Sequence, residues 1–196
     1  MTNNKNILLI DTSLPGISIV LHNVIENKIV SEHISFDQNS NGKQSVELPI
    51  AVEKFISKNN LKFSGLSAIG IVVGPGSFTG IRLGIAYAKG LSIGLNIPVI
   101  PVNAFEIYLA RSMDAFVAID SKRGDFFVAA HNIEPCTMTI DDIETKQMEY
   151  AKTVGHKPYD LKDALTIIEN KLESKKSEPV IPMYMRPSYA ELNCKC

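Results

Sequence analysis

Residues 74–80 read Gly-Pro-Gly-Ser-Phe-Thr-Gly, and this loop decides the fold that the surrounding sequence predicts. It follows Ala68–Val73, a run of small and β-branched residues that is typical of a buried strand. It precedes residues 81–95, whose apolar character predicts a long buried helix. A strand, a glycine loop and a helix in this order are the usual layout of a phosphate site, because helix N-terminal amides point at the loop.

The spacing of the loop departs from the common nucleotide-binding motifs. No lysine follows Gly80, as a Walker loop requires, and Thr79 stands where the dinucleotide pattern has its third glycine. The alternative is a tight turn in which Ser77 or Thr79 caps the following helix. Both interpretations rest on the same signature-loop residues, which are Gly74, Pro75, Gly76, Ser77, Thr79 and Gly80.

The helix after the loop has glycines in its interior, at Gly84, Gly90 and Gly94. Each costs about 0.5–1 kcal/mol relative to alanine in such a position. We therefore expect another element to approach the backbone of this helix closely and to offset that cost.

Apolar residues surround the same helix on two sides. At about 100° per residue, one side carries Gly84, Ala88 and Leu91. The other side carries Ile81, Ile85, Ala86 and Ile93 around a narrow polar strip of Arg82 and Lys89. A helix that is apolar nearly all round is buried on both sides, either within its own chain or partly by another protein.

The preceding helix gives a similar indication. Its main apolar face runs from Leu48 to Ile56, and two further apolar residues lie off that face. We predict that the two helices form an interface with a partner protein and that Ile85→Asp abolishes partner binding while the monomer stays folded. The predicted interface residues are Val46, Ile50, Ile81, Arg82, Ile85 and Lys89.

The remaining pattern predicts an α/β fold with one mixed sheet in its first part. Further strands are expected over Ile7–Ile10, Ile17–Leu21, Ile29–Phe36, Val99–Val102, Ala115–Ile119 and Phe126–His131. Further helices are expected over 103–112, 141–147 and 161–172.

The second half of the chain resembles the first. Leu9–Ser13 and Ala118–Lys122 each end a strand with Ile-Asp and a hydroxyl residue, and each precedes a turn and a second strand. Chance similarity is the alternative, but the shared order favours a duplicated fold. We expect a first lobe at residues 1–112 and a smaller second lobe at residues 113–196. Asp11 and Asp120 are then candidate vestigial phosphate or metal positions.

Composition narrows the class of protein. The chain has 196 residues, 45% of them hydrophobic, and a formal net charge of −1. A folded core is therefore expected, and binding to nucleic acid through the overall charge is not.

The apolar run Ile7–Ile10 is too short for a signal-peptide core or a membrane span. Of the cysteines Cys136, Cys194 and Cys196, the last two could bind metal or form a reduced, frayed end. A reducing cytoplasm is the expected location.

Residues 10–13 and 74–84 closely resemble the signature of the TsaB family, also called YeaZ, and residues 182–187 resemble its C-terminal segment. The resemblance implies an actin/hexokinase-like fold (ASKHA, ribonuclease H-like) of two related lobes with the second one reduced. It implies a non-catalytic subunit of the bacterial system that forms threonylcarbamoyladenosine in tRNA. In that system TsaB pairs with the catalytic subunit TsaD through the two helices that flank the signature loop, and the ATPase TsaE joins them.

The same resemblance implies that this chain binds no cofactor itself, because ATP and metal belong to the partner subunits. It implies that tRNA is reached through the complex, and the isolated chain could form a homodimer. TsaD carries Val-Asn-His-Leu-Glu-Gly-His at the start of a helix, where two histidines four residues apart bind its metal. Ala104 and Tyr108 hold those positions here, so the chain resembles the partner and not the catalyst.

Other functional classes stay open as alternatives. A glycoprotease-like peptidase needs a nucleophile with a base, or a metal, and the sequence shows neither pattern. A small ATP-dependent kinase would use Asp11 and Asp120 beside phosphates and magnesium, although both can instead cap turns. Direct tRNA binding would use a basic cluster for which a solvated face is the preferred interpretation: Lys152, His156, Lys157 and Lys162.

Overall fold

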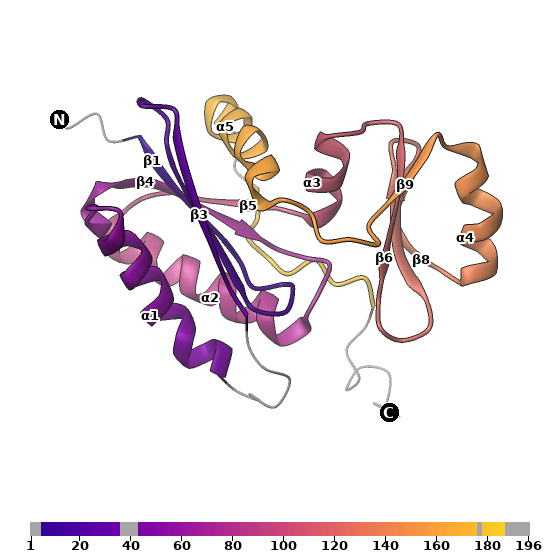
Figure 1. Ribbon diagram of the computed structural model, residues 1–196, viewed down its shortest axis with the longest axis horizontal. Helices are drawn as coiled ribbons and strands as arrows, with labels where there is room; N and C mark the ends of the chain where they lie inside the picture. The colour runs from indigo at the N-terminus through magenta and orange to yellow at the C-terminus, as the bar shows by residue number, and fades with distance from the viewer. Residues whose placement is uncertain (1–4, 36–42, 176–177, 187–196) are drawn as a thin grey trace.

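A computed structural model describes residues 5–35, 43–175 and 178–186 (Figure 1). They form two β-sheets that lie next to each other along the long axis of the molecule, each covered by helices. Cys194 and Cys196, considered above as a metal-binding or frayed end, lie outside these residues.

The first sheet has five strands in the order β3-β2-β1-β4-β5. β2 pairs antiparallel with β1 and β3, whereas β4 runs parallel to both β1 and β5. The bounds are β1 Asn6–Asp11, β2 Ile17–Asn23, β3 Lys28–Ile34, β4 Leu66–Val72 and β5 Val99–Val102. β1 is apolar at every position from 7 to 10 because helices cover both faces of the sheet.

Two helices lie side by side against one face of this sheet, α1 (Lys43–Lys58) and α2 (Phe78–Leu95) (Figure 1). On the other face are α3 (Ala104–Ala110) and α5 (Ala164–Ser174). We call this sheet with its helices the first lobe. The core is therefore a three-layer arrangement with the carboxyl end of β1 directed toward the second sheet (Figure 1).

The second sheet has four strands in the order β8-β7-β6-β9. Its elements are β6 Ala115–Asp120, β7 Phe126–Ala130, β8 Ile133–Met138, α4 Ile140–Lys146 and β9 Lys152–Val154, and we call them the second lobe. β6 pairs antiparallel with β7 and parallel with β9, as β1 does with β2 and β4. The predicted duplication is confirmed by this shared order, and the described residues hold no counterpart of β5 in the second sheet.

The helix α3 joins the two lobes. Its Ile107 packs in the core of the first lobe with β5 and α5, while its Phe105 packs with Val117 and Ala129 of the second sheet. Phe105 and Ile107 are both buried, at 3% and 1% exposed. One short helix therefore contributes to two hydrophobic clusters.

The division into residues 1–112 and 113–196 stays a prediction, but one part of the second range packs on the first sheet. Leu161, Leu165 and Ile168 are buried against Leu9 and Val72. The strands β8 and β9 were not predicted, because β8 contains Pro135 and β9 has only 3 residues. No helix among residues 5–35, 43–175 and 178–186 is long and apolar enough to cross a membrane.

Candidate functional site

The signature loop packs directly against the carboxyl end of β1. The hydroxyl of Thr12 donates a hydrogen bond of 2.7 Å to the carbonyl of Gly80, and the amide of Ser77 donates one of 2.7 Å to the carbonyl of Ser13. The Ser77 side chain accepts from the amide of Gly80, which is the geometry of the helix-capping alternative. The Gly74–Pro75 peptide bond is cis. The loop therefore joins β1 to the start of α2 through contacts within the chain.

Two glycines of α2 are required by this contact. A Cβ on Gly80 would lie 2.0 Å from the carbonyl oxygen of Thr12, and one on Gly84 would lie 2.3 Å from the Thr12 hydroxyl. In contrast, a Cβ on Gly90 or Gly94 would have no neighbour within 4 Å. The expected close approach thus explains Gly84 within this chain, but neither Gly90 nor Gly94.

Asp11 is buried at the end of β1, and protein donors bind both of its carboxylate oxygens. Oδ1 accepts from the amide and the hydroxyl of Ser13, at 2.7 and 2.6 Å. Oδ2 accepts from the hydroxyl of Tyr159 at 2.7 Å. Burial raises the pKa of Asp11, against the opposite effect of these hydrogen bonds. Tyr159 had no signal in the sequence.

Asp120 holds the equivalent position in the second lobe and has a different environment. It is exposed, its Oδ1 accepts from the amide of Lys122 at 2.7 Å, and its Oδ2 pairs with the ammonium of Lys122 at 2.8 Å. These hydrogen bonds lower the pKa of Asp120. Both aspartates accept from the amide two residues later, as the turn-capping alternative requires.

Protein donors already pair with both aspartates, which disfavours a magnesium–nucleotide site at these positions. At Asp11 the amide and the hydroxyl of Ser13 bond Oδ1, and the hydroxyl of Tyr159 bonds Oδ2. At Asp120 the ammonium of Lys122 pairs with Oδ2. Across the ranges that the structure describes, no group of three or more His, Cys, Asp or Glu residues could hold a metal ion.

The positions that carry histidines in TsaD have structural roles here. Ala104 is buried at the first position of α3. The hydroxyl of Tyr108 donates to the carbonyl of Lys157 at 2.6 Å. Partial burial raises the pKa of Tyr108 to about 12, so its phenol stays neutral and remains a donor at neutral pH.

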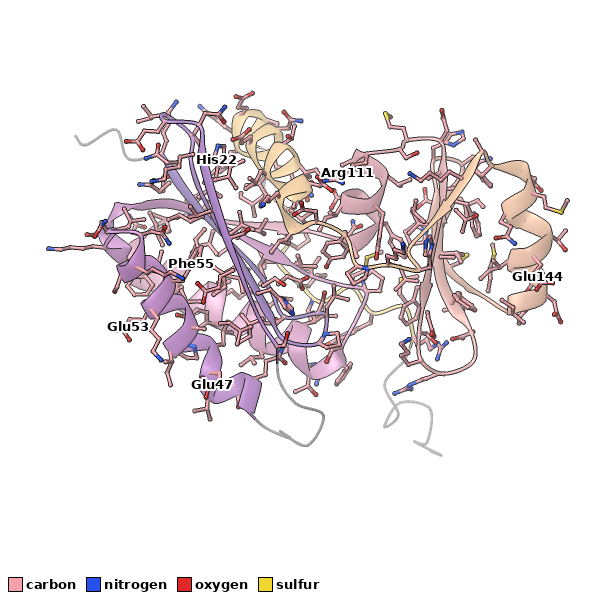
Figure 2. All side chains as sticks on the ribbon, in the orientation of Figure 1. His22, Glu47, Glu53, Phe55, Arg111 and Glu144 are labelled. Atoms are coloured by element: carbon pink, nitrogen blue, oxygen red, sulfur yellow. The ribbon has the colours of Figure 1, made fainter. Side chains whose placement is uncertain are left out.

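The outer sides of α1 and α2 expose large apolar side chains together with charged ones. Val46 is 63% exposed, Ile50 40% and Ile93 84%, and Arg82 and Lys89 are also exposed. Figure 2 shows Glu47 and Glu53 directed away from the sheet and Phe55 directed toward it. We call the exposed side of these two helices the α1/α2 face.

Ile81 and Ile85 do not belong to that face, which corrects the prediction for these two residues. They are only 2% and 5% exposed and pack in the core of the first lobe. The buried part of α2 comprises Gly80, Ile81, Gly84, Ile85 and Ala88, so it includes residues from both apolar sides of the helix. Ile85→Asp would therefore place a charge in the core and unfold the chain, so it cannot test partner binding.

Arg82 has a second role that the sequence did not indicate. Its guanidinium carbon lies 3.7 Å from the centre of the Phe78 ring, and its Nε donates to the hydroxyl of Tyr184. Phe78 and Tyr184 are stacked, with ring centres 5.2 Å apart. The segment 178–186, which we call the tail, is thereby held at the start of α2.

The tail also contacts the signature loop and the second lobe. The amide of Met183 donates to the carbonyl of Val73 at 2.8 Å, next to Gly74. Arg186 forms an ion pair with Asp125 and donates to the hydroxyl of Ser121 at 3.2 Å. The resemblance of residues 182–187 to a family segment was the only sequence signal for these contacts.

The basic cluster considered for tRNA binding does not form one patch. Lys152 begins β9 beside Ala115, whereas His156 and Lys157 follow the opposite end of that strand. Lys162 lies in the short helix η3 (Leu161–Asp163), which packs on the first lobe.

Known proteins resemble this chain in sequence over most of the described residues. A family model described as "TsaD: tRNA N6-adenosine threonylcarbamoyltransferase" matches residues 38–186. A curated "tRNA threonylcarbamoyladenosine biosynthesis protein TsaB" of Bacillus subtilis (strain 168) is 31% identical over 129 residues, covering 64% of this chain and 54% of the relative. The protein of the same name from Haemophilus influenzae is 29% identical over 132 residues, covering 63% of this chain and 52% of the relative. The chain spans about half the length of these curated relatives.

Solved structures give the fold. The structure titled "YeaZ from Pseudomonas aeruginosa" superposes with a TM-score of 0.72 at 17% identity, covering 92% of this chain and 99% of that one. This likeness, with the two related sheets, confirms the actin/hexokinase-like fold that was expected. The family match over residues 38–186 and the TsaB-named relatives lead to one assignment: the chain belongs to the TsaD family that this model describes and, within it, to the TsaB (YeaZ) proteins.

Proposed function

We propose that this chain is a non-catalytic binding subunit in the formation of threonylcarbamoyladenosine in tRNA. It pairs with TsaD, acts together with the ATPase TsaE, and reaches tRNA through the complex in the cytoplasm. The relatives named as TsaB biosynthesis proteins support the assignment to this pathway.

The observation that carries this proposal is the α1/α2 face. Val46, Ile50 and Ile93 leave large apolar side chains partly or mostly in water, and complete burial of a fully exposed side chain of this kind stabilises by about 1.5–3 kcal/mol. Gly90 and Gly94 leave open backbone next to Ile93, which lets a second helix approach closely. A partner helix on this face would account for both the exposed apolar residues and the unopposed glycines.

Charges around the face match the usual anatomy of an interface, in which an apolar centre has a polar rim. Glu47 and Glu53 border it on α1, and Arg82 and Lys89 border it on α2. A partner that binds here also needs charges of opposite sign at the edge of its own surface. Such a charge pattern would favour TsaD over other proteins that expose an apolar helix.

The kinase alternative is not favoured by the geometry at Asp11. Both of its oxygens accept hydrogen bonds from Ser13 and Tyr159, so binding of magnesium there would require breaking contacts that already satisfy a buried carboxylate. A binding role requires no such change.

Co-expression with the TsaD of the same organism tests the proposal. We expect the wild-type chain and TsaD to co-purify, and Ile93→Asp to lose the pairing because it replaces the most exposed large apolar side chain of the α1/α2 face, in the last turn of α2, by a charge. The matched control is Met148→Asp, since Met148 is 85% exposed in the second lobe, close to the 84% of Ile93. Circular dichroism should show both variants folded.

The modification assay completes the test. TsaD, TsaE, tRNA and threonylcarbamoyl adenylate should give threonylcarbamoyladenosine with the wild-type chain and with Met148→Asp, and little product without the chain or with Ile93→Asp. Co-purification of Ile93→Asp at wild-type yield would exclude the α1/α2 face as the pairing surface. Undiminished product without the chain would exclude the proposed role.

A further inference from the structure

Residues 155–160 form the crossing segment that returns from β9 of the second lobe to the first lobe (Figure 1). The side chain of Tyr159 points from this segment to the end of β1. Its hydroxyl donates to Oδ2 of Asp11 at 2.7 Å and lies 3.2 Å from the hydroxyl oxygen of Ser13. The crossing segment is thus bound to the strand that leads into the signature-loop contact.

A second tyrosine holds the same segment from the side of α3. The ring of Tyr108 meets the ring of Tyr159 edge to face, with centres 5.2 Å apart and an interplanar angle of 82°. The Tyr108 hydroxyl donates to the carbonyl of Lys157 at 2.6 Å. Two phenols therefore hold the segment at positions two residues apart.

The start of the crossing segment is fixed to the second lobe. Gly155 has a φ of +107°, and a Cβ there would lie 2.4 Å from the carbonyl oxygen of Ala118 in β6. The segment is consequently short and anchored at both ends, to β6 at Gly155 and to β1 at Tyr159. A movement of one lobe relative to the other would have to break the Tyr159 contacts or distort this backbone.

We propose that Tyr159, supported by Tyr108, is an internal latch that fixes the second lobe against the end of β1 and keeps the cleft between the lobes closed. The latch is a property of the isolated chain and goes beyond the proposed function. The hydroxyl of Tyr159 makes the contact with Asp11 that a ligand or solvent would make if the cleft between the lobes were open. The lobes then behave as one rigid unit and do not open and close around a ligand.

Hydrogen–deuterium exchange of the full chain tests the latch. In Tyr159→Phe the Asp11 hydrogen bond is lost, and we expect amides of the crossing segment to exchange at least about tenfold faster, with β4 unchanged. Tyr108→Phe keeps the contact between Tyr159 and Asp11 and should accelerate the same amides less. The matched control is Tyr150→Phe, because Tyr150 donates its hydroxyl to Asn132 within the second lobe.

The outcomes separate a latch from a general loss of stability. Unchanged exchange in the crossing segment of Tyr159→Phe, or equal acceleration there and in β4, would overturn the proposal. If Tyr159→Phe does not fold, Tyr108→Phe decides, and exchange of its crossing segment equal to that of Tyr150→Phe overturns the proposal. Protection of this segment in the wild-type chain on addition of magnesium and ATP would also overturn it, because a closed cleft cannot admit the ligand. Failure of these tests leaves the pairing with TsaD unaffected.

Discussion

At Gly80 the space between α2 and β1 admits a hydrogen atom and excludes a methyl group. The Cβ of an alanine would lie 2.0 Å from the carbonyl oxygen of Thr12, a backbone atom that cannot move alone. We expect Gly80→Ala to lower the free energy of unfolding by about 1–3 kcal/mol through overpacking. Gly90→Ala has open space and should raise it by about 0.5–1 kcal/mol, because alanine is the better helix former. Urea titrations that gave both changes the same sign would contradict this account of α2.

The buried carboxyl of Asp11 should make the free energy of unfolding decrease as the pH rises. Burial raises its pKa in the folded chain above the ordinary value of 3.8. The folded chain therefore binds this proton more tightly than the unfolded chain, and the contribution of Asp11 to stability falls as the pH rises from 3.8 through the raised pKa. The Asp11→Asn variant has no titrating group at this position. The free energy of unfolding of the variant minus that of the wild type should therefore increase across this pH window and level off above it. A pH-independent difference in urea titrations would contradict the assigned direction.

The sequence identified Asp11 but not the residue that satisfies it. Ile-Asp recurs at Asp120, so the repeat marked both positions for attention. Tyr159 is 148 residues away from Asp11 and belongs to no motif or periodic pattern. Contacts of this kind depend on how two lobes meet, which a local pattern does not contain.

At the scale of the element, α2 shows why periodicity can locate a helix and still misplace its faces. Both sides of the helix are apolar, so the hydrophobic pattern could not decide how α2 is turned toward the sheet. The buried residues come from both sides: Gly84 and Ala88 from one, and Ile81 and Ile85 from the other. Glycine in a helix interior was a correct signal of close approach at Gly84, whereas no atom of another element among the described residues lies within 4 Å of a Cβ placed on Gly90.

The packing of α5 on β4 gives a prediction for a pair of elements. A Cβ on Gly70 would lie 2.3 Å from Cδ1 of Ile168 and 2.9 Å from Cδ1 of Leu9. Gly70→Ala should cost about 1–3 kcal/mol and Ile168→Val about 0.5–1.5 kcal/mol. Because valine lacks that Cδ1, the double variant should be more stable than the sum of the two costs implies, by about 1 kcal/mol.

A double-mutant cycle by urea unfolding measures this coupling. Val52→Ala provides the control in place of Ile168→Val, since Val52 is fully buried on the opposite face of the first sheet. Strict additivity of Gly70→Ala with Ile168→Val would show that α5 does not press on β4 as described.

At the scale of the whole molecule, the repeat of a strand that ends in Ile-Asp and pairs with the next strand was predictable from the sequence, whereas β8 and β9 of the second lobe were not. The reach of the first lobe into the second half of the chain was not predictable either. α5 returns to the first lobe because its sheet has two apolar faces and α1 and α2 cover only one of them, whereas Val180 and Met183 of the tail pack on the α1 and α2 side. The second lobe in turn relies on α3 and the tail for part of its core, through Phe105 and Met185.

That sharing predicts that the two lobes unfold together, and Phe105 is the residue whose loss should separate them. It is buried from α3 into the second sheet, so Phe105→Ala should cost about 3–5 kcal/mol, carried mostly by the second lobe. We expect one calorimetric transition for the wild type and an additional, earlier transition for Phe105→Ala. Phe55→Ala is the matched control: Phe55 is also 3% exposed, but it packs only in the first lobe. Its transition should move to lower temperature, and a single transition for both variants would mean that α3 does not couple the lobes.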